Sequence, residues 1–350
     1  DWANFTIDPS AIPQEKLDTT VYLAVSVRGL ENPYIATIKV GMEMFAEYLD
    51  SIGQKYEMQV LDSQGDSAKE VDNMRQFAAM ANGNAIAYAD PNEDTIAYSL
   101  AEAMAESGGY LGTAWNKPAD VGPADLTPNW VCHTSPDNVV NGYNTAKALF
   151  DAMGGKGQIF VCQGLLGNTA ANDRYAGLRQ ALAEYPDIEV AADDTANWNT
   201  DEALALVETW LTQYPDVGGV WCANDNMATG ALQALDNAGL KGKVGVTGVD
   251  ANTDIVEAVR DGNATATVSS NGWLQGGYTL AICYAAWTGL LDVEALPAEY
   301  REFATPAVVI SSPEAAEEYL TSTPEFDFSK IFYCKADRSP RPNSNSNYIV

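Results

Sequence analysis

The sequence predicts an α/β protein with two lobes, each built around a parallel β-sheet. Short apolar runs such as VYLAVSV, GQIFVCQG and VGVTGVD alternate with longer segments of helical period along most of the chain. Nearly continuous apolar runs of this kind are typical of strands that helices cover on both faces. A chain of 350 residues also exceeds the usual size of one hydrophobic core, which favours two domains.

The expected strands form two groups along the chain. They are residues 21–27, 57–62, 84–89, 110–114 and 129–133, then 157–163, 187–191, 218–223, 244–249 and 265–269, with 307–310 as the last. Helix patterns follow the strands with ordinary start and stop signals, such as Pro33 in a first turn and the pair Gly154 and Gly155 after a last turn. Apolar positions recur on one face of each pattern, so we expect these helices to pack on the sheets.

Breaks in this alternation, near residues 135–137, 270–271 and 305–306, predict three crossings between the lobes. Each lobe is then built from discontinuous sequence. We expect a linker at 1–19, an N-terminal lobe of 20–136 plus 271–305, a C-terminal lobe of 137–270 plus 306–334, and a tail at 335–350. The tail is rich in Pro, Asn and Ser and is predicted to be disordered.

Charge excludes one class of function and favours another. The chain has 48 acidic and 19 basic residues and a net charge of −29, so it lacks the basic surface that nucleic-acid phosphates require. The same charge favours a soluble monomer. No apolar run is long enough to span a bilayer. The start at Asp1 without Met fits an extracytoplasmic chain whose signal peptide was removed, and it fits a trimmed chain equally well.

The cysteines show no spacing typical of a zinc site. They are Cys132, Cys162, Cys222, Cys283 and Cys334. We interpret them as small buried apolar side chains, and one disulfide through Cys334 stays open.

Residues for catalysis are scarce. The single histidine, His133, ends a predicted strand, no GxSxG elbow occurs, and His133 is interpreted as structural. No phosphate-binding glycine pattern follows a strand. Paired carboxylates of the glycosidase kind stay open, because 48 acidic residues supply many pairs. The sequence therefore predicts a binding protein with no catalytic residues, no metal and no cofactor.

Aromatic, amide and charged side chains gather in loops or at the ends of the predicted strands, and open parallel sheets bind ligands at those strand ends. They include Ser26, Trp115, Asn116, Trp198, Asn224, Asp225 and Asp250. An indole face can cover the apolar C–H side of a sugar ring, while Asn, Asp and Arg side chains can hold hydroxyl groups. The pattern therefore points to a polyol as the ligand.

Each of these candidates also has a structural alternative. The tryptophans could pack at the rim of a core, and Arg28 and Arg174 could be solvated. The Asn and Asp candidates that precede a helix could act only as N-caps: Asn32, Asn224, Asp225 and Asp250.

Residues 21–310 resemble the type I periplasmic sugar-binding proteins, in the ribose-binding-like branch of ABC-transporter solute-binding proteins. Phrases such as VLDSQGDSAKEVDNM, NTAANDRYAGLRQAL and YPDVGGVWCANDNMATGALQAL occur in the family's order. The resemblance implies two Rossmann-like lobes joined by a three-strand hinge. It implies capture of a monosaccharide or sugar alcohol between the lobes and delivery to an ABC transporter permease. It also implies a secreted protein that works at the membrane, in the periplasm or outside the cell. Whether such a protein carries a lipid anchor or diffuses freely stays open.

The resemblance further implies which residues contact the ligand. They are Ser26, Asn32, Tyr34, Trp115 and Asn116 from the N-terminal lobe, and Arg174, Trp198, Asn224, Asp250 and Ser270 from the C-terminal lobe and its crossover. Ribose binders carry an Asp-Arg pair where this chain has Trp115 and Asn116, which argues against ribose as the ligand. Arg28, in a longer loop, is a candidate replacement for that Arg.

Other functions stay open at this point. A sugar or autoinducer sensor for chemotaxis or two-component signalling would use the same residues, and a carbohydrate-active enzyme would convert the bound sugar. The fold also forms the core of LacI-type repressors, but no helix-turn-helix precedes residue 21 and the acidic charge would repel DNA.

Overall fold

The computed structural model describes residues 2–6, 8–305, 307–322, 326–328 and 330–334. Within this part, the chain forms two compact units. Unit 1 comprises the described residues of Asp1–Pro136, Asn271–Pro306 and Pro324–Val350, and unit 2 comprises those of Asp137–Ser270 and Ala307–Thr323. The tail at 335–350, predicted to be disordered, lies outside the described residues.

Unit 1 contains a six-stranded sheet whose described strand pairs are all parallel. Its order is β12-β6-β5-β4-β2-β3. The strands are β2 (Val21–Val27), β3 (Tyr56–Asp62), β4 (Ala85–Ala89), β5 (Tyr110–Ala114), β6 (Trp130–Thr134) and β12 (Glu302–Phe303). Strand β4 is buried at every residue, as its continuous apolar run predicts.

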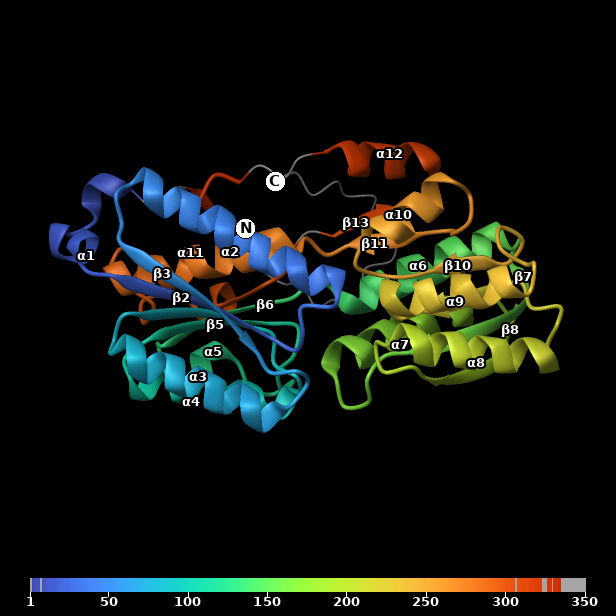
Figure 1. Ribbon diagram of the computed structural model, residues 1–350, viewed down its shortest axis with the longest axis horizontal. Coiled ribbons are helices and arrows are strands. Elements are labelled where there is room, and N and C mark those ends of the chain that lie inside the picture. The colour runs from blue at the N-terminus through green and yellow to red at the C-terminus, as the bar shows by residue number, and fades with distance from the viewer. Residues whose placement is uncertain (1, 7, 306, 323–325, 329, 335–350) are drawn as a thin grey trace. The chain divides into compact units, whose positions relative to one another are not determined.

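Four helices cover this sheet. They are α2 (Pro33–Ser51), α3 (Ser67–Ala81), α4 (Ala97–Glu106) and α11 (Gly272–Thr288). Figure 1 shows α2 and α11 on one side of the sheet and α3 and α4 on the other. Helix α2 lies very close to α11, since a Cβ added at Gly41 would be 2.2 Å from the carbonyl oxygen of Trp273. The short α5 (Pro123–Leu126) precedes β6.

The first residues differ from the linker that the sequence suggested. Strand β1 (Trp2–Thr6) pairs with β14 (Lys330–Cys334), and the short helix α1 (Gln14–Asp18) follows. The Gln54 amide donates hydrogen bonds to the carbonyl oxygens of Lys16 at 3.1 Å and Thr19 at 2.8 Å. The Lys16 ammonium also lies 4.3 Å from the centre of the Trp287 ring. This segment is therefore folded onto unit 1.

Unit 2 contains a four-stranded parallel sheet of order β10-β9-β7-β8. Its strands are β7 (Lys156–Gln163), β8 (Asp187–Thr195), β9 (Gly219–Cys222) and β10 (Gly245–Thr247). Its helices are α6 (Asn138–Ala152), α7 (Thr169–Glu184), α8 (Thr200–Gln213), α9 (Asp225–Asn237), α10 (Thr253–Arg260) and α12 (Pro313–Thr321). Strand β13 (Val308–Ile310), expected to close the array, instead pairs antiparallel with β11 (Thr267–Ser269).

Two glycines bring α6 and α7 into backbone contact. A Cβ added at Gly142 would lie 2.0 Å from the carbonyl oxygen of Arg174, and one at Gly177 would lie 2.0 Å from that of Val139. The backbones of α6 and α7 are therefore in direct contact at these two positions. This contact sets the position of Arg174, a candidate ligand-binding residue.

Four cysteines confirm the interpretation as buried apolar side chains. Cys132, Cys162, Cys222 and Cys283 are buried free thiols. Burial raises the pKa of the Cys132 thiol to about 12, so it stays protonated. The side chain of Cys334 lies outside the described part of the chain.

Replacing Gly142 with Ala is expected to destabilise the protein, although Ala normally favours a helix over Gly by about 0.5–1 kcal/mol. The added methyl overlaps the α7 backbone, so Gly142→Ala should lower the free energy of unfolding by about 1–3 kcal/mol in urea denaturation. Val140→Ala is the control, because Val140 is 42% exposed on the same helix. Equal stability of Gly142→Ala and the wild type would contradict the close packing of α6 and α7.

Candidate functional site

The candidate residues of unit 1 lie at the carboxyl ends of the neighbouring strands β2, β4 and β5. Asp90, which follows β4, accepts hydrogen bonds from two of these candidate residues, Arg28 and Asn116. Arg28 Nη2 donates to Asp90 Oδ1 at 3.0 Å, and Asn116 Nδ2 donates to the same oxygen at 3.2 Å. Asn116 also donates to the carbonyl oxygen of Pro91 at 2.9 Å. Arg28 is thus ion-paired, and the solvated alternative is wrong for it.

Two aromatic candidates of unit 1 pack against each other. The Tyr34 and Trp115 rings meet edge to face, with their centres 5.5 Å apart. Tyr34 also donates its hydroxyl hydrogen to Gln275 Oε1. Trp115 has a φ of 65°, a left-handed conformation that is costly for a bulky residue and that often marks a functional site.

The other two candidates of unit 1 bond within the protein. Ser26 is buried and donates to Glu70 Oε1 at 3.2 Å. Asn32 caps α2, where its side chain accepts a hydrogen bond from the Tyr34 backbone N–H at 2.9 Å. Asn32 is therefore an N-cap, and a ligand contact by either residue stays a prediction.

Arg174 joins the candidates of unit 2. Its Nε donates to Asn138 Oδ1 at 3.0 Å, its Nη1 donates to the Ala223 carbonyl at 2.7 Å, and its Nη2 lies 3.9 Å from Asp250 Oδ1. The side chain is only 4% exposed, so the solvated alternative is wrong for this residue as well. The guanidinium is held in one orientation by three groups from separate parts of unit 2.

Trp198 lies beside this guanidinium. Arg174 Cζ is 5.6 Å from the centre of the indole ring, within the range of a cation–π contact. The ring packs over Gly164, where an added Cβ would be 2.2 Å from Trp198 Cη2. Trp198 is partly exposed and has a φ of 64°. The structure therefore brings Arg174, Trp198 and Asp250 together.

The remaining candidates of unit 2 divide into a cap, a strained residue and a buried hydroxyl. Asn224 caps α9 by accepting from the Met227 backbone N–H at 3.0 Å. Asp250 does not cap α10, which begins after Asn252, and it has a φ of 130°. Ser270 is buried, and its hydroxyl has no hydrogen-bond partner among the described residues.

With this geometry established, the chain can be compared with known proteins. It matches the model of the periplasmic binding protein domain over residues 23–290. The chain belongs to the periplasmic binding protein family. The ribose import binding protein of Salmonella typhimurium is 32% identical over 247 residues, covering 71% of this chain and 78% of that protein. The xylitol-binding protein of Mycolicibacterium smegmatis is 36% identical over 197 residues, covering 56% of this chain and 55% of that protein.

Solved structures agree with this assignment. A twin-arginine translocation pathway signal protein from Burkholderia phytofirmans superposes with a TM-score of 0.81 at 35% identity, covering 85% of this chain and 91% of that chain. A periplasmic solute-binding protein of an ABC transporter from Actinobacillus succinogenes, with bound D-allose, gives 0.75 at 26% identity, covering 85% and 100%. The resemblance to the ribose-binding-like branch and the α/β fold class are confirmed.

Sequence reasoning missed the burial of two acids of this periplasmic binding protein: Glu70 was not a candidate, and Asp225 was considered only as a polar residue at a strand end or as a helix cap. Glu70 on α3 is fully buried, and this burial raises the pKa of its carboxyl to about 8. Asp225, the first residue of α9, is also fully buried, and burial together with the charge of Asp250 raises its pKa. In the sequence they are hidden among 48 acidic residues, and no local pattern distinguishes a buried carboxyl from an exposed one.

Sequence reasoning also missed Asp90. The phrase ADPNED reads as a turn after a strand, because Asp, Pro and Asn are common turn residues. Only the pairing of β4 with β2 and β5 shows that Asp90 lies beside Arg28 and Asn116. Its position directly after an apolar run was the one signal that could have identified it.

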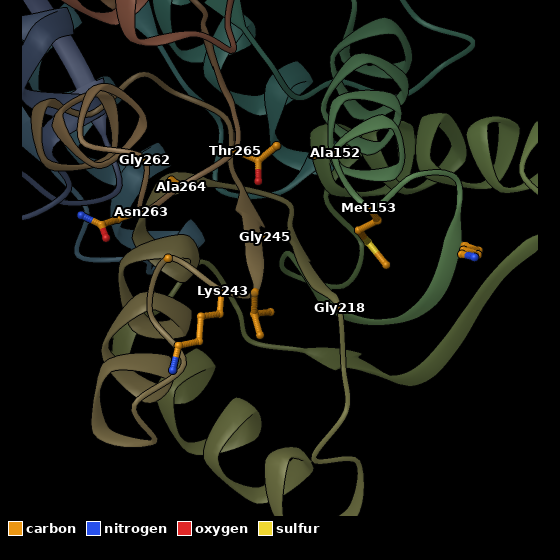
Figure 2. A pocket seen from close by; sticks show the side chains of 12 residues that line it. Ala152, Met153, Gly218, Lys243, Gly245, Gly262, Asn263, Ala264 and Thr265 are labelled. Carbon is orange, nitrogen blue, oxygen red and sulfur yellow. The ribbon is translucent and has the colours of Figure 1, made fainter.

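Unit 2 also has a hollow that none of its candidate residues line. It has a volume of about 370 Å³, and Lys156, Gly218 and Gly245 are among its lining residues. Figure 2 shows Met153, Lys243 and Thr265 around it. Lys156, Gly218 and Gly245 lie at the amino ends of β7, β9 and β10, and no candidate residue lines the hollow. It is therefore not the predicted ligand site.

His133 is buried, and its Nδ1 lies 2.9 Å from Thr113 Oγ1, which fits the structural interpretation. Across the described ranges, no three His, Cys, Asp or Glu side chains gather as a metal site would require. None of the helices in that part of the chain is both long and apolar enough to cross a membrane.

Asn224→Ala should destabilise the ligand-free protein, because the first turn of α9 loses its cap. We expect the free energy of unfolding to fall by about 1 kcal/mol in urea denaturation, while Asn224→Ser, which keeps an oxygen acceptor, retains most of it. An Asn224→Ala protein as stable as the wild type would show that the bond to the Met227 N–H contributes nothing.

Proposed function

We propose that this chain is an extracytoplasmic solute-binding protein that captures an uncharged monosaccharide or sugar alcohol and delivers it to the permease of an ABC transporter. Members of its family are binding proteins of the periplasm. Relatives named for ribose, allose and xylitol support a ligand rich in hydroxyl groups. The proposal includes no catalytic step.

The observation that carries this proposal is the charge balance in each set of side chains. Arg28 faces Asp90 at 3.0 Å in unit 1, and Arg174 faces Asp250 at 3.9 Å in unit 2. A charged ligand would need a counter-charge that these pairs already use, and burying an unpaired charge is costly. Hydroxyl groups both donate and accept, so they can bond to guanidinium and carboxylate alike.

The aromatic rings support the same class of ligand. Trp115 and Trp198 each hold a left-handed backbone conformation beside one of the Asp–Arg pairs. Such strain persists only where the surrounding structure imposes it. A flat indole next to polar groups suits a sugar, whose ring has an apolar C–H side and a polar edge.

Unsatisfied buried atoms supply a basis for selectivity. Asn116 Oδ1, Trp198 Nε1 and Ser270 Oγ are buried and have no hydrogen-bond partner in the described part of the chain. In either unit, a ligand hydroxyl that reaches such an atom satisfies it. A sugar with one hydroxyl misplaced leaves a buried polar atom unpaired, which costs about 1–3 kcal/mol. Epimers should therefore differ clearly in affinity.

A calorimetry panel tests the proposed class of ligand. We expect at least one of xylitol, D-ribose, D-allose and myo-inositol to bind and to raise the melting temperature by mass action. The acid D-ribonate and the amine D-glucosamine should bind about 100-fold more weakly than that ligand or not at all. The bound sugar should be recovered chemically unchanged. Tight binding of a charged analogue alone, or conversion of the sugar, would contradict the proposal.

Trp198→Ala should weaken binding of that ligand at least about tenfold, because the indole surface is lost. Trp198→Phe keeps a smaller flat surface and should lose less affinity. Val190→Ala is the control, since Val190 is 41% exposed on β8. If Trp198→Ala binds as tightly as the wild type in calorimetry, Trp198 does not contact the ligand.

A further inference from the structure

Two buried acids, one in each unit, make equivalent hydrogen bonds. In unit 1, Glu70 Oε2 accepts from the backbone N–H of Asn92 at 2.9 Å, and Glu70 Oε1 accepts from the Ser26 hydroxyl at 3.2 Å. Glu70 is fully buried within unit 1. One carboxyl thus connects the end of β2 with the turn that follows β4.

Unit 2 repeats this arrangement with other residues. Asp225 Oδ2 accepts from the backbone N–H of Asn252 at 2.8 Å, and the Thr267 hydroxyl lies 2.8 Å from Asp225 Oδ1. Thr267 Oγ1 also accepts from the Ala251 N–H at 3.2 Å. Asp225 is fully buried as well. This carboxyl connects β11 with the turn that follows β10.

The turns themselves have the same form. Asn92 lies two residues after Asp90, and Asn252 lies two residues after Asp250. We call these segments the Asp-x-Asn corners. Each corner begins with the carboxylate that faces an Arg at 3.0 or 3.9 Å. The buried acid therefore bonds to the last residue of the same short turn whose first residue is the Asp of the Asp–Arg pair.

The corner of unit 2 is strained and needs such an anchor. Asp250 has a φ of 130° and Ala251 a φ of 55°, and neither is glycine. The backbone also leaves room for the anchor, because a Cβ added at Gly248 would lie 2.2 Å from Asp225 Oδ1. A strained turn persists only where other contacts hold it. Asp225 supplies such a contact through the Asn252 N–H.

We propose that Glu70 and Asp225 are positioning residues, each of which anchors an Asp-x-Asn corner so that Asp90 and Asp250 present their carboxylates in the geometry that ligand hydroxyls require. The ligand in this inference rests on the proposed function. The anchoring of the corners rests on the hydrogen bonds alone.

The pKa shifts of Glu70 and Asp225 indicate which substitutions test the anchoring. Burial raises the pKa of Glu70 to about 8, with a further increase from Asp90 and a decrease from the Asn92 N–H, Arg28 and Ser26. Glu70 is therefore mostly neutral at pH 7. Burial and the charges of Asp250 and Asp254 raise the pKa of Asp225, whereas the bonds to Thr267 and Asn252 lower it. Glu70→Gln and Asp225→Asn keep an uncharged oxygen acceptor for the backbone N–H, and the Ala variants remove the anchors.

Hydrogen exchange measures the anchoring directly, without a ligand. In Glu70→Ala we expect the Asn92 amide to exchange at least tenfold faster than in the wild type, while the Val161 amide in unit 2 is unchanged. Asp225→Ala should do the same to the Asn252 amide. Glu70→Gln and Asp225→Asn should restore protection to within threefold. Asp72→Ala, on the exposed face of α3, is the control.

Affinity measures the consequence for binding. The probes are xylitol, D-ribose, D-allose and myo-inositol, by calorimetry. Glu70→Ala and Asp225→Ala should bind the ligand of the wild type at least tenfold more weakly, and the Gln and Asn variants should recover that affinity to within threefold. Wild-type amide exchange in both Ala variants, unchanged affinity in both, or failure of the Gln and Asn variants to restore either property would overturn the inference.

The pH dependence of stability supplies a further readout for Glu70. Its folded-state pKa of about 8 lies above its ordinary value of 4.5, so the folded protein holds a proton that the unfolded chain releases. This contribution to stability is complete below pH 4.5 and is lost as the pH rises to about 8. The wild type should lose more stability than Glu70→Gln across that window, and parallel curves would contradict a neutral anchor.

The outcomes separate this inference from the proposed function. If the wild type binds none of the probes, the proposed function fails, and the exchange of the Asn92 and Asn252 amides still decides whether the acids anchor the corners. If the wild type binds a probe and the Ala variants bind it equally well, the proposed function stands and the positioning role fails.

Discussion

A buried guanidinium must find acceptors for its hydrogens and a carboxylate for its charge, and much of unit 2 around β7, β9 and β10 can be traced to this need of Arg174. The side chain reaches Asn138 at the start of α6, the carbonyl of Ala223 after β9, and Asp250 after β10. Arg174 reaches Asn138 because α6 and α7 approach so closely at Gly142 that no side chain fits between them, and it reaches the other two groups where β9 and β10 end. The packing of two helices thus decides the orientation of one charged group.

Unit 1 satisfies the same need with less burial. Arg28 is partly exposed and shares the Asp90 carboxylate with the Asn116 amide. In both units the charges are balanced within the protein, and an aromatic residue in a left-handed conformation lies nearby. A protein that must release its ligand benefits from this balance, because a neutral ligand bound by hydrogen bonds and an indole face has no strong ion pair to break.

Glu70 and Asp225 are buried acids that bond to the turns carrying Asp90 and Asp250. A buried carboxyl is costly, and the cost is reduced when the group stays protonated and accepts hydrogen bonds from the backbone. Burial raises the pKa of both acids, each accepts a hydrogen bond from a backbone N–H, and each connects a neighbouring strand to a turn. In the inference above, Asp90 and Asp250 therefore depend on a second layer of buried polar groups, Glu70 and Asp225.

The sequence by itself determined the fold class, since apolar runs covered on both faces specify parallel strands and their order in the chain. It also located β2 and β5 to the residue and placed Trp115 and Asp250 at strand ends, because the period of apolar residues is a local property. It could not choose between a cap and a ligand contact for Asn32 or Asn224, since both roles use the same side chain at the same helix start. Asp90, Glu70 and Asp225 were decided only by the tertiary structure. Which of 48 acidic residues is buried, and what it bonds to, depends on strands and helices that meet from distant parts of the chain.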